Sequence, residues 1–267
     1  MMRSLVTPLF VPGNKSGLFA KAAASGTDAV IYDLEDAVSF AEKDIAREAV
    51  AGRAKTSLYE IVRVNSASSG LLHEDLQAIR NNPPTAVMVA KAEAGRDLAA
   101  ITEMLGTEIE LIPLIETARA LAALPDILAT DNVRCAAFGS IDFALDIGCS
   151  QDRLALLSAR SELVLRSRLA NRGSPIDGVT VAIDDPTAVT DDALHAKSLG
   201  FGGKLAIHPR QIGPILSSFS ATEDEIAWAR RVLQSLGDGN ALKVDGEMID
   251  RPLIERARSI LAAINGD

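Results

Sequence analysis

The stretch Glu110-Leu-Ile-Pro-Leu-Ile-Glu116-Thr indicates the fold, because an apolar run ends directly on a carboxylate. Short apolar runs bounded by polar residues are typical of parallel strands that are buried on both faces. Seven further runs have this character. In chain order the eight runs are Leu5–Val11, Ala29–Tyr32, Ile61–Val64, Ala86–Ala90, Glu110–Ile115, Arg134–Phe138, Gly178–Ile183 and Gly203–Ile207. Each run predicts a strand.

Amphipathic stretches lie between these runs and predict helices. Examples are Gly17–Ala24, Glu42–Ala51, Asp97–Leu105, Thr117–Leu128 and Arg153–Ala170. Strands that alternate with helices form βαβ units, which require a parallel sheet. Eight such units in 267 residues favour a (β/α)8 TIM barrel, a fold of about 250 residues. We therefore predict an α/β protein whose residues 1–220 form a catalytic barrel.

Two more helices are predicted after the eighth run. Thr222–Leu236 opens with Thr222-Glu-Asp-Glu225, which has the pattern of a capping box. The second helix lies near Pro252–Ile264. Because a barrel needs neither helix, residues 221–267 are predicted to form a C-terminal helical extension.

Composition excludes several classes of protein. The formal charge is 27 − 36 = −9 and no basic run occurs, which argues against a nucleic-acid partner. No stretch reaches the 18 or so apolar residues of a membrane span. Cys135 and Cys149 are the only cysteines and do not make a disulfide framework, so we expect reduced thiols and a cytoplasmic protein.

Polar residues follow most of the apolar runs. They are Asn14, Asp33, Glu35, Asp36, Arg63, Asn65, Lys91, Glu93, Glu116, Asp142, Asp184, Asp185 and His208. In a parallel barrel these positions meet at the carboxyl ends of the strands, where active sites lie. The concentration of polar residues at one rim predicts an enzyme.

Carboxylates dominate this rim, whereas the chain has only three histidines. Glu116 and Asp142 are 26 residues apart, about one βα repeat, so they should be neighbours. Mg²⁺ is usually held by one or two carboxylates, whereas zinc would need more His or Cys. The pair predicts a Mg²⁺ site. The alternative is that both residues cap adjacent helices.

Two basic residues of the rim allow more than one interpretation. Arg63 interrupts a buried strand, so it either forms a structural ion pair with a rim carboxylate or binds a substrate oxygen that becomes negative. Lys91 is either an ion-pair partner or a Schiff-base lysine. The cluster Asp33-Leu-Glu35-Asp36 would accept hydrogen bonds from water bound to a metal, and its crowded charge favours a nearby cation.

The order of several motifs resembles a known family. They are Leu9-Phe-Val-Pro-Gly-Asn14, Asp33-Leu-Glu-Asp-Ala-Val38, Arg63-Val-Asn65, Leu114-Ile-Glu-Thr117, Gly139-Ser-Ile-Asp-Phe143, Gly200-Phe-Gly-Gly-Lys204 with Ile207-His-Pro209, and Asp245-Gly-Glu-Met-Ile-Asp250. Together they look like the citrate lyase beta-subunit group of the HpcH/HpaI aldolase family, which includes malyl-CoA and citramalyl-CoA lyases. The resemblance runs from about Arg3 to Ala263.

The resemblance implies a Mg²⁺-dependent carbon–carbon lyase that cleaves or forms a 3-hydroxyacyl thioester. Its partners would be a 2-oxo acid and an acyl thioester of CoA or an acyl-carrier protein, and the enzyme would be a homotrimer or hexamer. The matching residues imply roles. Glu116 and Asp142 would bind Mg²⁺; Arg63, Glu116 and Lys21 would contact substrate; and Arg63, Asp250, Glu35 and Asp36 would serve catalysis.

Three alternatives stay open. A pyruvate-type aldolase acting on free hydroxy-oxo acids belongs to another branch of the same superfamily. A barrel that binds a thioester without turnover is the second. The third concerns Asp250, which in several relatives reaches a neighbouring subunit's active site as the acid/base but which here also precedes a predicted helix, where it would be an N-cap.

Overall fold

The computed structural model describes residues 5–236, 243–244 and 247–265. They divide into two compact units, one ending at Phe219 and the other beginning at Ser220. The first unit carries an eight-stranded parallel sheet and the second carries two helices and a two-stranded ribbon.

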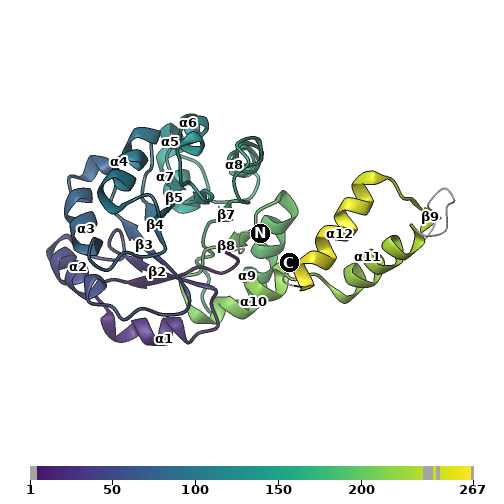
Figure 1. The fold of residues 1–267 in the computed structure, drawn as a ribbon, viewed down its shortest axis with the longest axis horizontal. Coiled ribbons are helices and arrows are strands. Elements are labelled where there is room, and N and C mark those ends of the chain that lie inside the picture. The colour runs from purple at the N-terminus through teal and green to yellow at the C-terminus, as the bar shows by residue number, and fades with distance from the viewer. Residues whose placement is uncertain (1–4, 237–242, 245–246, 266–267) are drawn as a thin grey trace. The chain divides into compact units, whose positions relative to one another are not determined.

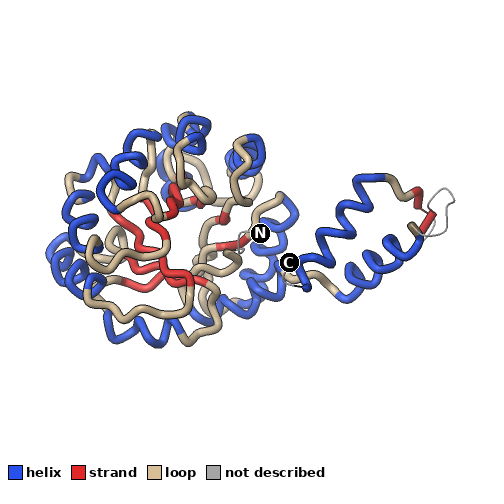
Figure 2. The backbone as a smooth tube through the Cα atoms, in the orientation of Figure 1, coloured by secondary structure: helices blue, strands red, loops and turns tan. Residues whose placement is uncertain are grey.

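The sheet of the first unit runs in the order β1-β2-β3-β4-β5-β6-β7-β8. The strands are β1 Leu9–Pro12, β2 Ala29–Asp33, β3 Tyr59–Val64, β4 Ala86–Val89, β5 Glu110–Ile115, β6 Ala137–Phe138, β7 Ile176–Asp177 and β8 Gly203–Lys204. Figures 1 and 2 show a curled sheet with the helices on its outer side. The segments around the first and last strands are hydrogen-bonded: Lys204 N–H donates to the Val6 carbonyl and Ala206 N–H to that of Pro8.

The helices of this unit follow the strands in alternation. They are α1 Phe19–Ala23, α2 Lys43–Ala51, α3 Leu72–Ile79, α4 Gly95–Leu105, α5 Ala118–Ala122, α6 Leu124–Ala129, α7 Ser140–Ile147, α8 Leu157–Leu169, α9 Pro186–Leu199 and α10 Ile212–Phe219. The predicted α/β class with eight parallel strands is therefore confirmed.

The predicted position of the seventh strand is wrong. We expected Gly178–Ile183, whereas β7 is Ile176–Asp177. Val181 and Ile183 are 63% and 39% exposed, so the apolar residues of this run lie in the loop after the strand. A short strand whose second residue is a buried aspartate has little apolar pattern, and the loop's alternating side chains mimicked one.

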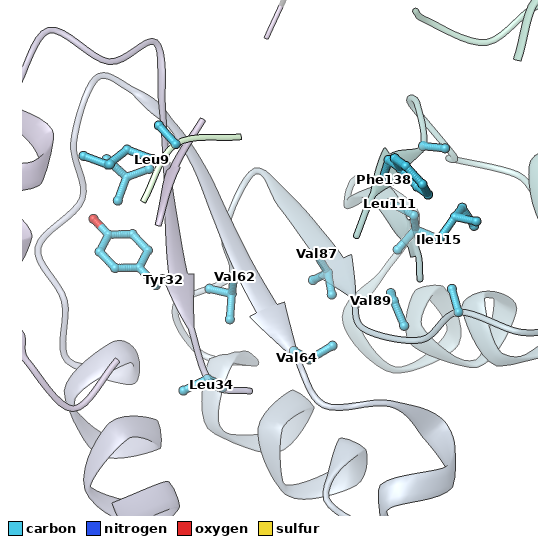
Figure 3. Close-up of a cluster of buried hydrophobic side chains, with 14 of the residues drawn as sticks. Leu9, Tyr32, Leu34, Val62, Val64, Val87, Val89, Leu111, Ile115 and Phe138 are labelled. Atoms are coloured by element: carbon cyan, nitrogen blue, oxygen red, sulfur yellow. The ribbon is translucent and has the colours of Figure 1, made fainter. Parts of the chain in front are cut away.

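Side chains alternate between the two faces of each strand and form two layers of core. On β2, for example, Val30 and Tyr32 pack with the layer beneath the helices, whereas Ala29 and Ile31 pack on the other face. Figure 3 shows Tyr32 in the first of these layers, near Leu9 and Val62. The second face also holds Ile61 and Leu114. Arg63 and Glu116 follow these two residues by two positions, so the alternation directs them to the same face as this inner layer.

The second unit is a helical pair. It comprises α11 Glu223–Ser235, β9 Lys243–Val244, β10 Glu247–Met248 and α12 Arg251–Asn265. The predicted capping box at Thr222 is confirmed, with Thr222 accepting from Glu225 N–H and Glu225 accepting from Thr222 N–H. Its small core is formed by Ala229, Val232, Ile249 and Ala257. Across the described part of the chain, no helix combines the length and apolarity that a membrane crossing requires.

Candidate active site

A small pocket of about 70 Å³ lies at the carboxyl ends of the strands. It is lined by Phe10, Arg63, Leu114, Glu116, Phe138, Gly139, Ser140, Ile141, Asp142, Val179 and Leu205. Among these are three of the residues singled out from the sequence: Arg63 from β3, Glu116 after β5 and Asp142 after β6. The pocket is where the structure brings them together.

Glu116 is 1% exposed, and one of its two carboxylate oxygens is fixed by a hydrogen bond. Its Oε1 accepts a hydrogen bond of 2.7 Å from the Lys91 backbone N–H, and no described residue donates to Oε2. Burial, opposed by the charge of Lys91, raises the pKa of Glu116 to about 8. Gly139 packs against this side chain, because a Cβ there would come within 2.5 Å of both Glu116 Cβ and Oε2. The glycine therefore leaves the room that the carboxylate occupies.

Asp142 lies in the first turn of α7 and lines the same pocket. Its carboxylate makes no hydrogen bond or ion pair with any residue in the described ranges. The alternative that Glu116 and Asp142 are helix caps is wrong. Thr117 caps α5 by accepting from Ala120 N–H, and Gly139 occupies the N-cap position of α7 without a side-chain bond.

Arg63 forms the predicted ion pair and also faces the pocket. Its Nε and Nη2 donate to the two oxygens of Asp33 at 2.7 and 2.6 Å, and Nη1 lies 3.1 Å from Glu35 Oε2. Its guanidinium carbon lies 4.7 Å from the Phe10 ring centroid, within the range of a cation–π contact. A guanidinium has five N–H donors, so this pairing leaves donors for a substrate oxygen.

The acidic cluster after β2 is neutralised by cations of the chain itself. Glu35 Oε1 accepts from Lys91 Nζ at 2.9 Å, and Asp36 Oδ2 lies 4.0 Å from Arg63. The nearby cation that the crowded charge favoured is supplied by Lys91 and Arg63, so this cluster adds no separate support for a metal. Asp36 is the exposed member, with 54% of its side chain accessible, whereas Asp33 is fully buried.

Lys91 is an ion-pair lysine. Its Nζ also lies 3.9 Å from Glu116 Oε1. Burial lowers the pKa of Lys91, but the hydrogen bond to Glu35 and the charge of Glu116 outweigh this and raise that pKa. An ammonium held in this way is a poor nucleophile, so the Schiff-base interpretation loses its support.

Sequence reasoning missed Lys43, a buried lysine whose ammonium hydrogen-bonds to the loop after β2. Its Nζ donates to the carbonyls of Leu34 and Glu35 at 2.6 and 2.7 Å and to Asn65 Oδ1 at 3.0 Å. Burial lowers the pKa of Lys43, and the charge of Asp75 opposes this. The available signal was its spacing: on α2, Lys43, Ala46 and Val50 all lie on the buried face.

Other predicted residues lie elsewhere. Lys21 is exposed on α1. Asp250 is exposed just before α12, where its Oδ1 accepts from Leu253 N–H at 3.4 Å, as an N-cap does. Asp185 caps α9, and His208 Nδ1 accepts from Arg210 N–H. Asp250, Asp185 and His208 accept hydrogen bonds from local backbone donors, and none of these four residues lines the pocket.

The donor set of the pocket suits a hard divalent cation. The Asp142 carboxylate and Glu116 Oε2 accept no hydrogen bond from the described residues, and both residues line one pocket. Within those residues, no group of three or more His, Cys, Asp or Glu side chains is arranged for a metal. Two carboxylates and no imidazole or thiolate fit Mg²⁺, which keeps several of its ligands as water or substrate.

The fold and this pocket define a class: a parallel α/β protein with two carboxylates and an arginine at the carboxyl ends of its strands. Residues 7–209 match the family model of the HpcH/HpaI aldolase/citrate lyase family. The chain belongs to that family.

Relatives extend over nearly the whole chain. The citrate lyase subunit beta-like protein of Deinococcus radiodurans is 32% identical, with 95% of each chain covered. A (3S)-malyl-CoA thioesterase of Cereibacter sphaeroides is 30% identical over 95% of this chain and 92% of that protein. The crystal structure of CitE from Mycobacterium tuberculosis in complex with magnesium, acetoacetate and coenzyme A has 29% identity and a TM-score of 0.89, covering 99% and 100% of the two chains.

Proposed function

We propose that this protein is a Mg²⁺-dependent carbon–carbon lyase that cleaves or forms a 3-hydroxyacyl-CoA thioester. The observation that carries the proposal is the pocket in which Glu116, Asp142 and Arg63 meet. Family membership supports it, as does the likeness to a CitE structure that holds magnesium and coenzyme A. The products would be a 2-oxo acid and an acyl thioester.

We also propose that the curled sheet closes as a (β/α)8 barrel. Supporting this are the hydrogen bonds between the segments of β1 and β8, including that from Phe10 N–H to the Ala206 carbonyl at 2.9 Å. Closure would place Phe10 and Leu205 beside Arg63 around one rim, in keeping with their shared pocket.

The chemistry follows from the charges of the pocket. When bound by Glu116 and Asp142, Mg²⁺ would act as a Lewis acid and template for the hydroxyl and carboxylate oxygens of a 2-hydroxy acid group. Arg63, kept in place by Asp33, would donate hydrogen bonds to the thioester enolate that leaves. Glu35 and Asp36 would hold Arg63 and Lys91 in place.

Metal removal tests the proposal directly. Chelation should abolish turnover and added Mg²⁺ should restore it. Glu116→Ala and Asp142→Ala should each abolish turnover. The melting temperature of Asp142→Ala should stay near that of the wild type, because the Asp142 side chain has no hydrogen-bond or ion-pair partner among the described residues. Full turnover in excess EDTA would contradict the proposal.

Substrate class is tested by product analysis with a panel of 3-hydroxyacyl-CoAs and free 4-hydroxy-2-oxo acids. A lyase forms an acyl-CoA and a 2-oxo acid. Hydrolysis, the activity named for the relatives of Cereibacter sphaeroides, would instead form free CoA and a hydroxy acid, and it is the second candidate. Cleavage of only the free hydroxy-oxo acids would identify a pyruvate-type aldolase. Metal-dependent turnover of any substrate in the panel would contradict a non-catalytic barrel.

Arg63→Lys tests the role of the guanidinium. Lysine keeps the positive charge but lacks the planar guanidinium, which pairs with both oxygens of Asp33 and at the same time faces the pocket. We expect turnover to fall about 10²-fold or more, as on removal of an oxyanion donor. Near-normal kcat together with a lower melting temperature would instead assign Arg63 a purely structural ion pair.

Further features of the family are proposed for this chain. Lys21, exposed on α1, would contact the nucleotide end of CoA, and Asp250 would act as the acid/base on a neighbouring subunit of a homotrimer or hexamer. Residues 221–267 would then serve as a lid. The cytoplasmic location stays a prediction. CoA is proposed as the carrier of the acyl group, with an acyl-carrier protein as the alternative.

A further inference from the structure

Lys91 occupies an unusual backbone conformation at the end of β4. Its φ is +46°, in the left-handed region that a side chain with a Cβ rarely adopts. The residue is held there from both sides, because Ala90 N–H donates to the Val64 carbonyl at 3.2 Å and Ala92 N–H to the Leu114 carbonyl at 3.4 Å. A conformation of this kind persists only where its surroundings determine it, and such residues gather at functional sites.

The left-handed conformation gives Lys91 two separate contacts with the pocket. Its backbone N–H donates to Glu116 Oε1 at 2.7 Å. Its ammonium donates to Glu35 Oε1 at 2.9 Å, and Glu35 in turn lies 3.1 Å from Arg63 through its other oxygen. β4 lies between β3, which carries Arg63, and β5, which ends before Glu116. One residue therefore joins the groups on both neighbouring strands.

We propose that Lys91 is a positioning residue of this site: its main chain orients Glu116, and its ammonium fixes Glu35 and thereby Arg63. With Oε1 occupied by the Lys91 N–H, Glu116 keeps Oε2 for a cation. The proposal rests on the proposed function, since it concerns the same pocket.

The direction of the change in metal affinity separates positioning from simple charge effects. An ammonium 3.9 Å from Glu116 repels a cation at that carboxylate, so removing it would tighten metal binding if charge alone mattered. If the ammonium keeps Glu35 in place to accept hydrogen bonds from metal-bound water, removing it weakens metal binding.

Two variants isolate the ammonium. Lys91→Gly removes it and suits the positive φ, whereas Lys91→Met removes it and retains the side-chain bulk. Lys55→Met is the matched control. Lys55 is 53% exposed and precedes β3, so it lies at the amino ends of the strands, away from the pocket at their carboxyl ends. The measurements are calorimetric titration with Mn²⁺, melting temperature and crystal structures of the metal-free proteins.

We expect both Lys91 variants to bind Mn²⁺ at least about threefold more weakly than the wild type, with the Glu35 carboxylate displaced from Arg63 in the metal-free crystals. Lys55→Met should match the wild type. Unchanged or tighter Mn²⁺ binding, or an unmoved Glu35, would overturn the role of Lys91. A wild-type protein that binds no Mn²⁺ would contradict the proposed function instead, and the metal-free crystals would still decide the role of Lys91.

Discussion

Gly139 shows how one missing side chain sets the geometry of the pocket. Its φ is −87°, an ordinary value for any residue, so its backbone does not require glycine. What requires glycine is space, since a Cβ would lie within 2.5 Å of Glu116 Cβ and Oε2. Real side chains do not approach so closely, so an alanine would have to displace the carboxylate or the strand end.

Gly139→Ala should therefore impair the site more than the fold. We expect kcat/KM to fall at least about tenfold and Mn²⁺ to bind more weakly, with a loss of about 1–3 kcal/mol of stability from overpacking. Gly213→Ala is the control, because a Cβ at Gly213 meets nothing within 4 Å. Activity equal to the wild type in Gly139→Ala would mean that Glu116 can move without consequence.

At the scale of elements, the residue proposed as the acid/base, Asp250, directly precedes α12, which begins at Arg251. Asp250 accepts from Leu253 N–H, and the Asp250 carbonyl accepts from Ile254 N–H at 3.1 Å. Pro252 lies in the first turn, as predicted, where its missing N–H costs nothing. The capping interpretation of Asp250 therefore has structural support, and its catalytic role stays a proposal.

Asp250→Asn separates the cap from proton transfer. Asparagine caps as well as aspartate, so the melting temperature should not change, whereas an acid/base role predicts a fall in kcat of about 10²-fold or more. Asp250→Ala should in addition lose about 1 kcal/mol of stability measured by denaturation. Wild-type turnover in Asp250→Asn would leave Asp250 as a helix cap alone.

At the scale of the whole molecule, the chain forms two compact units. The first unit holds Arg63, Glu116 and Asp142 in one pocket, and Asp250 belongs to the second. If an active site takes Asp250 from a neighbouring copy, the functional unit is the oligomer and not the single chain.

Mixing two inactive proteins tests that arrangement. Asp250→Asn supplies an intact first unit, and Arg63→Ala supplies an intact Asp250. If Asp250 acts in trans, mixed oligomers should recover up to about a quarter of wild-type activity at equal ratios, because both intact parts meet at that fraction of sites. No recovery in oligomers proven to be mixed by native mass spectrometry would indicate that Asp250 does not act across subunits.

The sequence by itself determined the α/β class, every strand position except that of the seventh, the capping box at Thr222 and the candidate metal carboxylates. A strand buried on both faces must be apolar, so Glu110–Ile115 is visible without coordinates. Carboxyl ends of parallel strands meet at one edge, so Glu116 and Asp142 could be paired from their spacing alone. These inferences depend on local patterns and on one general rule of topology.

Only the tertiary structure decided which charges neutralise one another. Arg63 could have paired with several carboxylates, and the register of β2 against β3 places it opposite Asp33. Lys91 meets Glu35 across 56 positions of sequence. Such contacts depend on strand register and on the curl of the sheet, which no local pattern encodes. For the same reason Lys43, an ordinary helix residue by sequence, proved to be a buried support of the loop after β2.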